Sequence, residues 1–163
     1  MVAVSDTSVV SNLAFIGRLR LLASQFEMVW TPEAVRAELD RIPSVEAKDR
    51  IAEAVEAGWL RSRKVLNPRL AAALANDLDT GEAEAIALAT EIPADVLLID
   101  EKEGRGFARQ AGLRVRGVLG ILLRAKTKGE LASVKAEIRA LRDRAGFFVA
   151  PASEVEVLRS AGE

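Results

Sequence analysis

Val96-Leu97-Leu98-Ile99-Asp100 is the most hydrophobic strand-like stretch of the chain, and it stops at an aspartate. The opening run Val2-Ala3-Val4-Ser5-Asp6 stops in the same way. A run that is apolar at every position is typical of a strand buried on both faces, so we expect residues 96–99 near the centre of a sheet. Such runs alternate with helical segments, which is the pattern of β-α-β units. The sequence therefore predicts an α/β fold with a mostly parallel sheet.

The other elements are predicted from caps, chain breakers and apolar periodicity. Thr31-Pro32 has the arrangement of a helix N-cap followed by proline at the first helical position. The predicted strands are residues 2–5, 27–31, 59–65 (a strand or an extended arm), 96–99, 113–116 and an edge strand at 146–149. The predicted helices are residues 7–15, 18–25, 32–40, 44–57, 68–75, 80–91, 101–111, 117–126 and 130–144, with a small helix after residue 152.

The length of 163 residues suits one domain with a sizeable core, and no linker or repeat divides the chain. We expect a single domain over residues 1–150, followed by a tail or short helix over residues 151–163. No apolar stretch is long enough to span a membrane, and the first strand is not preceded by a signal peptide. A cytoplasmic location without membrane contact is therefore expected.

The residue types that the chain lacks exclude several kinds of site. It contains no Cys, no His and no Tyr. Disulfides, zinc knuckles and thiolate nucleophiles are excluded, as are a Ser-His-Asp triad and any metal site that needs imidazole. Catalysis is left to carboxylates, Lys, Arg, hydroxyls and amides.

Charge is unevenly distributed although the net charge is only −1. Residues 27–60 hold eight acids against four bases, whereas residues 102–128 hold eight bases and a single acid, Glu103. An enzyme that cleaves a polyanion needs a basic face, which binds the phosphate backbone, beside an acidic cavity, which binds cations. The alternative for the basic run is a solvated helix face.

Asp6 and Asp100 each follow a predicted strand, and the carboxyl ends of parallel strands share the sheet edge where ligands bind. Acids gathered at that edge repel one another unless a cation neutralises them, and ligands that are all oxygen suit Mg²⁺ or Mn²⁺. The pattern therefore indicates a metal-dependent phosphodiesterase. The alternative for each aspartate is a helix N-cap, beside Thr7 and Ser8 in the first case and Glu101 in the second.

Two further acids lie on predicted helices. Glu38 borders the apolar stripe of its helix, where a carboxylate is costly unless it is paired or bound to a metal; a surface position is the alternative. Glu82 and Glu84 are about 200° apart around one helix axis, so they cannot both face one site. Glu82 shares a face with Ala85 and Ile86, and we expect Glu82 to face the site.

Four blocks of sequence, in their order along the chain, resemble the PIN-domain family, and with the segment that follows them they cover most of residues 2–128. The subgroup that they resemble most has a Gly-Glu-Ala-Glu-Ala-Ile helix start and a Gly-Leu-x-Val strand after the last acid, here Gly112-Leu113-Arg114-Val115. The four blocks are Ser5-Asp6-Thr7-Ser8-Val9-Val10-Ser11-Asn12-Leu13, Pro32-Glu33-Ala34-Val35-Arg36-Ala37-Glu38-Leu39, Asp79-Thr80-Gly81-Glu82-Ala83-Glu84-Ala85-Ile86-Ala87-Leu88-Ala89 and Leu97-Leu98-Ile99-Asp100-Glu101.

The resemblance implies a three-layer α/β/α fold with a mostly parallel sheet, and ribonuclease activity that depends on Mg²⁺ or Mn²⁺. Many relatives are toxins of prokaryotic toxin–antitoxin modules. Two positions depart from the pattern: Leu98 stands where many PIN domains have Thr or Ser, and the third acid is Glu rather than Asp. Thr7 or Ser8 is implied as a supporting hydroxyl, and the implied catalytic and metal-binding acids are Asp6, Glu38, Glu82 and Asp100.

We hypothesise that Asp6 and Asp100 hold the principal ion, with Glu38 and Glu82 completing the site. Arg105 and Arg109, one turn apart on the helix after Asp100, are candidates for binding phosphate; surface charge is their alternative. The expected partner is RNA, with an antitoxin protein or a second copy of the chain as further possible partners. Two other functions stay open, an inactive PIN-like module that binds RNA or protein and a Mg²⁺-dependent receiver or phosphatase domain. Ser8, where phosphatases place a second Asp, disfavours a phosphatase.

Overall fold

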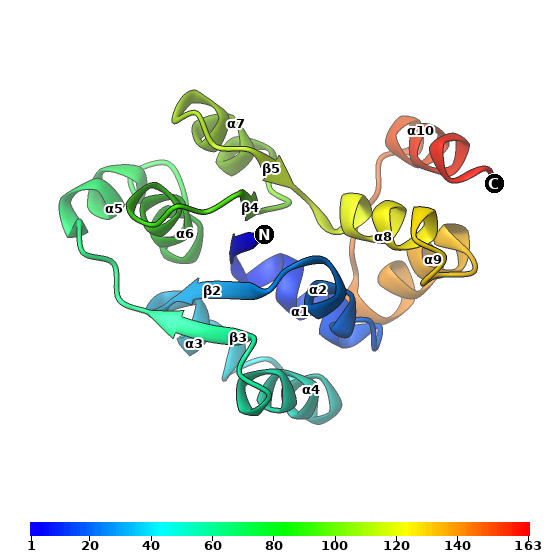
Figure 1. Cartoon of the computed structure of the whole chain (residues 1–163). Coiled ribbons are helices and arrows are strands. Elements are labelled where there is room, and N and C mark those ends of the chain that lie inside the picture. Colours follow the sequence, from blue (N-terminus) through cyan, green and yellow to red (C-terminus); the bar gives the residue numbers. More distant parts are fainter.

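The computed structural model describes residues 1–163 and contains one five-stranded sheet in the order β3-β2-β1-β4-β5 (Figure 1). Every neighbouring pair of strands is parallel, as the alternation of strands and helices predicts. The strands are β1 (Val2–Ser5), β2 (Met28–Pro32), β3 (Leu60–Arg63), β4 (Val96–Leu98) and β5 (Val115–Arg116).

Ten helices connect or follow these strands, and each matches a helix predicted from the sequence to within a few residues (Figure 1). They are α1 (Thr7–Phe15), α2 (Arg20–Gln25), α3 (Glu33–Leu39), α4 (Val45–Glu56), α5 (Pro68–Leu74), α6 (Thr80–Glu91), α7 (Lys102–Gln110), α8 (Val118–Thr127), α9 (Val134–Ala145) and α10 (Pro151–Ala161). None of them is long and apolar enough to cross a membrane.

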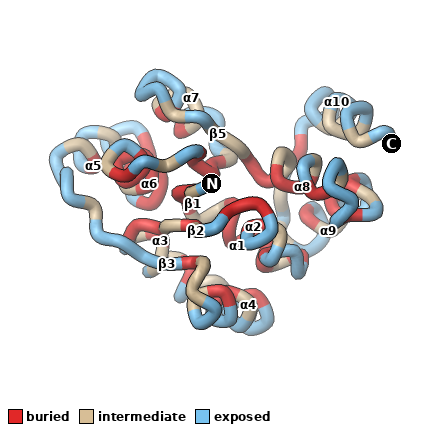
Figure 2. The backbone as a smooth tube through the Cα atoms, in the orientation of Figure 1, coloured by how far each residue is buried: buried red, intermediate tan, exposed pale blue.

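The sheet is buried on both faces, because successive side chains of a strand point to opposite sides. Ala3 of β1 and Leu98 of β4 belong to a core of 27 buried residues formed with α1, α2, α3, α4, α8 and α9. Val4 and Leu97, their sequence neighbours, belong to a second core of 11 residues formed mainly with α6 and α7. Figure 2 shows buried backbone between the two sets of helices. The predicted three-layer α/β/α architecture is confirmed.

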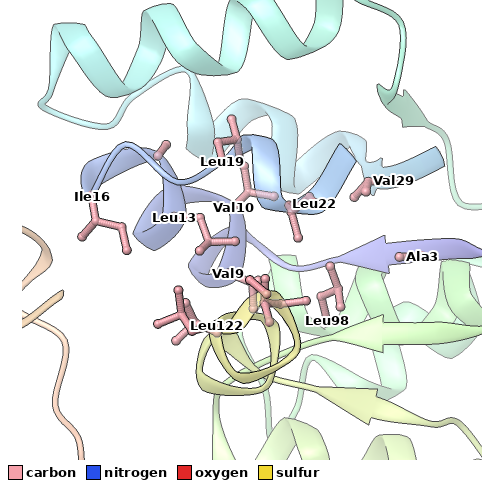
Figure 3. Close-up of a cluster of buried hydrophobic side chains, with 14 of the residues drawn as sticks. Ala3, Val9, Val10, Leu13, Ile16, Leu19, Leu22, Val29, Leu98 and Leu122 are labelled. Atoms are coloured by element: carbon pink, nitrogen blue, oxygen red, sulfur yellow. The ribbon is translucent and has the colours of Figure 1, made fainter. Parts of the chain in front are cut away.

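The larger core is built around α1, whose apolar side chains pack against both the sheet and the C-terminal helices. Val9, Val10 and Leu13 of α1 are fully buried, and the close-up shows Val9 between Leu98 of the sheet and Leu122 of α8 (Figure 3). The packing matters for function because α1 begins at Thr7, directly after Asp6. The position of Asp6 is thus fixed by a buried strand on one side and a buried helix on the other.

The strand order places a topological switch point between β1 and β4. From β1 the chain moves outward through β2 to β3, and it then returns to the other side of β1 to form β4 and β5. In open α/β sheets the crevice outside such a switch point is where ligands bind. Asp6 and Asp100 follow these two strands, so both lie at this crevice.

Two local predictions are wrong. Residues 146–149 form no strand: Gly146 ends α9 in the left-handed conformation, with φ of 61°, and no strand of the sheet pairs with the segment that follows. Thr31 is not a helix cap, because it lies in β2 and its hydroxyl faces Ser62 of β3 at 3.2 Å. Pro32 occupies the N-cap position of α3 instead, without a side-chain hydrogen bond.

We expect Leu122→Ala to lower the free energy of unfolding by about 2–5 kcal/mol, because the deletion leaves a cavity in the larger core. Leu66→Ala is the matched control: Leu66 is 74% exposed, so its loss should change stability by less than about 0.5 kcal/mol. Urea denaturation followed by circular dichroism measures both. Equal losses in the two variants would show that α8 does not pack as described.

Candidate active site

Asp6 is buried at the junction of β1 and α1, with only 2% of its surface exposed. Its backbone N–H donates to the carbonyl of Leu98 in β4 at 3.0 Å, which extends the ladder between the two strands. Its carboxylate accepts a hydrogen bond from the backbone N–H of Val9 at 3.1 Å and from the hydroxyl of Ser8 at 2.9 Å. Asp6 therefore caps α1, and the capping role coexists with a position at the crevice.

Asp100 is held at the start of a different helix. One carboxylate oxygen, Oδ1, accepts the backbone N–H of Val118 at 2.9 Å and so satisfies the first turn of α8 from 18 residues away in sequence. The cap position of α8 itself is Gly117, where an added Cβ would collide with Asp100 Oδ1. The other oxygen, Oδ2, is buried without a hydrogen-bond partner. A buried carboxylate oxygen without a partner is costly, and it is available to a ligand.

Glu82 is buried in the first turn of α6, where the side chain of Asp79 accepts its backbone N–H at 2.8 Å. Its Oε2 lies near α7, 3.6 Å from where a Cβ on Gly104 would be. Glu82 lies in the wall of a cavity of about 360 Å³ that contains six acids and no base. The lining residues are Asp6, Thr7, Ser8, Asp77, Asp79, Glu82, Glu101 and Glu103.

Glu38 is half-buried at the border of this site rather than in the wall of its cavity. It accepts a hydrogen bond from the hydroxyl of Thr7, and its Oε1 is 2.7 Å from where a Cβ on Gly81 would be. Glu38 thus lies against Thr7, which follows Asp6, and against Gly81, which precedes Glu82. Glu84 turns away from the site: its Oε2 accepts the backbone N–H of Ala34 at the start of α3, at 3.2 Å.

The pKa values of three of these acids are raised in the folded protein. Burial raises the pKa of Asp6 well above its ordinary range, and the charges of Asp100 and Glu82 raise it further. Burial also raises the pKa of Asp100 to about 6, against the opposing effects of the Val118 N–H and of Arg105. The pKa of Glu82 rises to about 7 through burial and the neighbouring charges of Asp79 and Glu101. Burial of the carboxylates is thus the largest cause of each shift, and neighbouring acids add to it.

Arginines are gathered in a second cavity of about 440 Å³, which has Asp100 in its wall. Arg105 and Arg116 line this cavity. Arg109, one turn away on the same helix, is exposed and does not line this cavity. Of the two predicted phosphate-binding arginines, only Arg105 therefore lies beside Asp100. A larger cavity of about 680 Å³ lies between α2 and α4, but Glu53 is its only acid.

The chemistry of the site fits a divalent cation that is coordinated by few protein side chains. The donors are all oxygen atoms, and the unpartnered Oδ2 of Asp100 is available beside a crowd of acids whose charges a cation would offset. No group of three or more acids is placed to hold one ion together. Mg²⁺ commonly uses one or two carboxylates and keeps several waters, so Asp6 and Asp100 are the residues that would hold it.

Several groups of the site are not evident in the sequence. Asp79 and Glu101 add negative charge to the cavity, and Arg116 adds positive charge beside Asp100. Asp79 has a local signal, because an aspartate three residues before a buried helical position is a typical N-cap. Arg116 has none, since its place depends on how β5 pairs with β4.

Without divalent cations, the stability of the protein should fall as the pH rises from about 4 to about 7. The folded pKa values of Asp6, Glu82 and Asp100 exceed their unfolded values, so these groups favour the folded state below the unfolded pKa and lose that contribution as the pH rises through the folded pKa. For Asp100, a rise from 3.8 to about 6 corresponds to roughly 3 kcal/mol. Thermal unfolding in EDTA measures the effect, and Asp100→Asn should reduce the pH slope. A slope unchanged by Asp100→Asn would contradict this account.

Comparison with known proteins identifies the family. A family model described as a PIN domain matches residues 2–163, nearly the whole chain, and confirms the resemblance found in the sequence. No curated protein and no solved structure shows a significant match. The matched residues include the parallel sheet, the switch point and all the acids described above. The chain therefore belongs to the PIN-domain family.

Proposed function

We propose that this protein is a ribonuclease that uses Mg²⁺ or Mn²⁺ held by Asp6 and Asp100. Membership of the PIN-domain family supports nuclease activity in general terms. The observation that carries the proposal is the proximity of buried Asp6 and half-buried Asp100 at the switch point, together with the buried, unpartnered Oδ2 of Asp100. Glu82 and Glu38 complete the site from α6 and α3. When bound, the ion supplies an activated water and neutralises charge on the scissile phosphate.

The residues of the chain have separate tasks in this proposal. Ser8 orients the carboxylate of Asp6 through its hydroxyl, and Thr7 holds Glu38 beside the site. Arg105 stands beside Asp100 and places a positive charge where the phosphate group of a substrate enters. The acidic cavity concentrates cations, whereas the neighbouring arginines attract the backbone of RNA.

The proposal extends to the biological role on the strength of the family resemblance alone. The closest subgroup by motif includes toxins of prokaryotic toxin–antitoxin modules, so an antitoxin protein is the proposed partner, with a cytoplasmic location. A homodimer would lengthen the basic surface. One observation favours a second candidate, an inactive PIN-like module that binds RNA or protein: no group of three acids is placed to hold an ion.

Neutralising either aspartate should abolish cleavage while preserving the fold. Asp6→Asn and Asp100→Asn keep an oxygen that accepts the capping hydrogen bonds but remove the charge, so we expect cleavage of RNA in Mn²⁺ to fall at least about 100-fold. Glu82→Gln should also reduce the rate. The matched control is Glu84→Gln on the same helix, which should leave the rate unchanged because Glu84 faces α3. Undiminished cleavage by both aspartate variants would overturn the assignment.

Metal binding separates the two candidate functions. An ion bound only by the folded protein stabilises it by about 2.7 kcal/mol at a hundredfold excess over Kd. We therefore expect Mn²⁺ to raise the Tm of the parent protein and to have a much smaller effect on Asp100→Asn. Differential scanning fluorimetry across a Mn²⁺ titration measures this. A parent Tm that does not respond would favour the inactive module.

A further inference from the structure

The cavity beside Asp100 has two walls of different chemistry. One wall is formed by Asp100, which follows β4, by Arg105 of α7 and by Arg116 at the end of β5. Phe147 and Phe148, from the segment between α9 and α10, form part of the other. Its volume of about 440 Å³ lies within the range of ordinary ligand sites. Charged and aromatic groups therefore face one space next to the proposed catalytic carboxylate.

Phe148 is the most exposed large apolar side chain of the protein, at 80%. Both of its neighbours in sequence are anchored. Phe147 packs against the larger core and donates its N–H to the carbonyl of Leu141 at 3.1 Å. Val149 is buried in the same core, with 4% of its surface exposed. The α10 helix, which follows, packs against α8 and α9. Phe148 therefore projects from a segment that is fixed on both sides, although no strand pairing holds it.

We propose that Phe148 is a stacking platform for a base of single-stranded nucleic acid. An exposed aromatic ring beside a positively charged groove is how proteins bind single strands, because every base offers a flat face for stacking. Arg105 and Arg116 bind the adjacent phosphates, and the strand leads to Asp100. The inference rests on the proposed function, and it adds a base-binding side chain, Phe148, outside the cluster of acids.

The charges around the cavity favour nucleic acid over a protein partner. Arg116 also lines a further cavity of about 530 Å³ with Arg124 of α8 and Lys128, the residue after α8, and this cavity contains no acid. The guanidinium of Arg116 lies over the ring of Phe26, 5.9 Å from its centroid, and its Nη1 has no hydrogen-bond partner, so no acid neutralises its charge there. Basic side chains therefore extend from Asp100 along both cavities, which suits a polyanion. Besides Asp100, Glu156 is the only acid that lines the cavity of Phe148.

Binding measurements without catalysis test the platform. Fluorescence anisotropy in EDTA compares a single-stranded oligoribonucleotide of about 12 nucleotides with a duplex and an abasic strand of equal length. We expect Phe148→Ala to weaken binding of the single strand by about 5- to 100-fold, with the duplex and the abasic strand nearly unaffected. Phe148→Trp should retain binding. Leu66→Ala, which removes an exposed apolar side chain outside this cavity, is the control and should change nothing.

Two results would overturn the inference. The first is single-strand affinity that Phe148→Ala leaves unchanged, including the case in which the variant instead alters self-association or protein binding. The second is an equal loss for the single strand, the duplex and the abasic strand. Failure of the proposed function has a different signature: the parent protein binds single strands through Phe148 but cleaves none of them when Mn²⁺ is added.

Discussion

The parallel pairing of β1 with β4 is the constraint on which the site depends. Its register sets Ser5 opposite Leu98, and the next N–H, that of Asp6, donates to the carbonyl of Leu98. A parallel ladder brings the carboxyl ends of two strands to one edge, although Asp6 and Asp100 are 94 residues apart. A shift of one residue in this ladder would turn the alternating side chains to opposite faces and separate the two carboxylates. The buried apolar residues on both faces make such a shift costly.

Crowding these acids opposes folding, and local structure offsets part of that cost. Asp6 accepts the Val9 N–H at the start of α1, and Asp100 accepts the Val118 N–H at the start of α8. Helix starts carry partial positive charge, so the carboxylates gain favourable interactions where the sheet edge places them. Of the two cap alternatives that the sequence leaves open, the one for Asp6 is confirmed, whereas the one for Asp100 is wrong for the helix that follows it: Glu101 is the N-cap of α7, and Asp100 serves the start of α8 instead. Each aspartate stabilises the start of a helix at the crevice, and the cost of burying its carboxylate is reflected in its raised pKa.

Residues whose place depends on local pattern could be predicted from the sequence, and those that depend on distant contacts could not. Apolar runs and helix geometry place Asp6 and Asp100 at one sheet edge and distinguish Glu82 from Glu84. The spacing of Arg105 and Arg109 indicates a shared helix face, but it cannot show that only Arg105 lies against the Asp100 cavity. Residues 146–149 are apolar enough for a strand, yet their side chains serve the core and the cavity while no strand pairs with them. The role of Phe148 follows from the packing of its neighbours, for which the sequence has no local signal.

The near-zero net charge of the protein conceals a strong separation of charge at the site. Six acids line one cavity, and the adjoining space is lined by Arg105 and Arg116, with Asp100 in its wall. Under the proposed function, repulsion by the first cavity and attraction by the second favour approach of the RNA backbone from the side of the arginines and Phe148. Cations are drawn to the opposite side. The fold thereby divides the two aspartates between the cavities: Asp6, after β1, lines the acidic one, and Asp100, after β4, lines the one that contains the arginines.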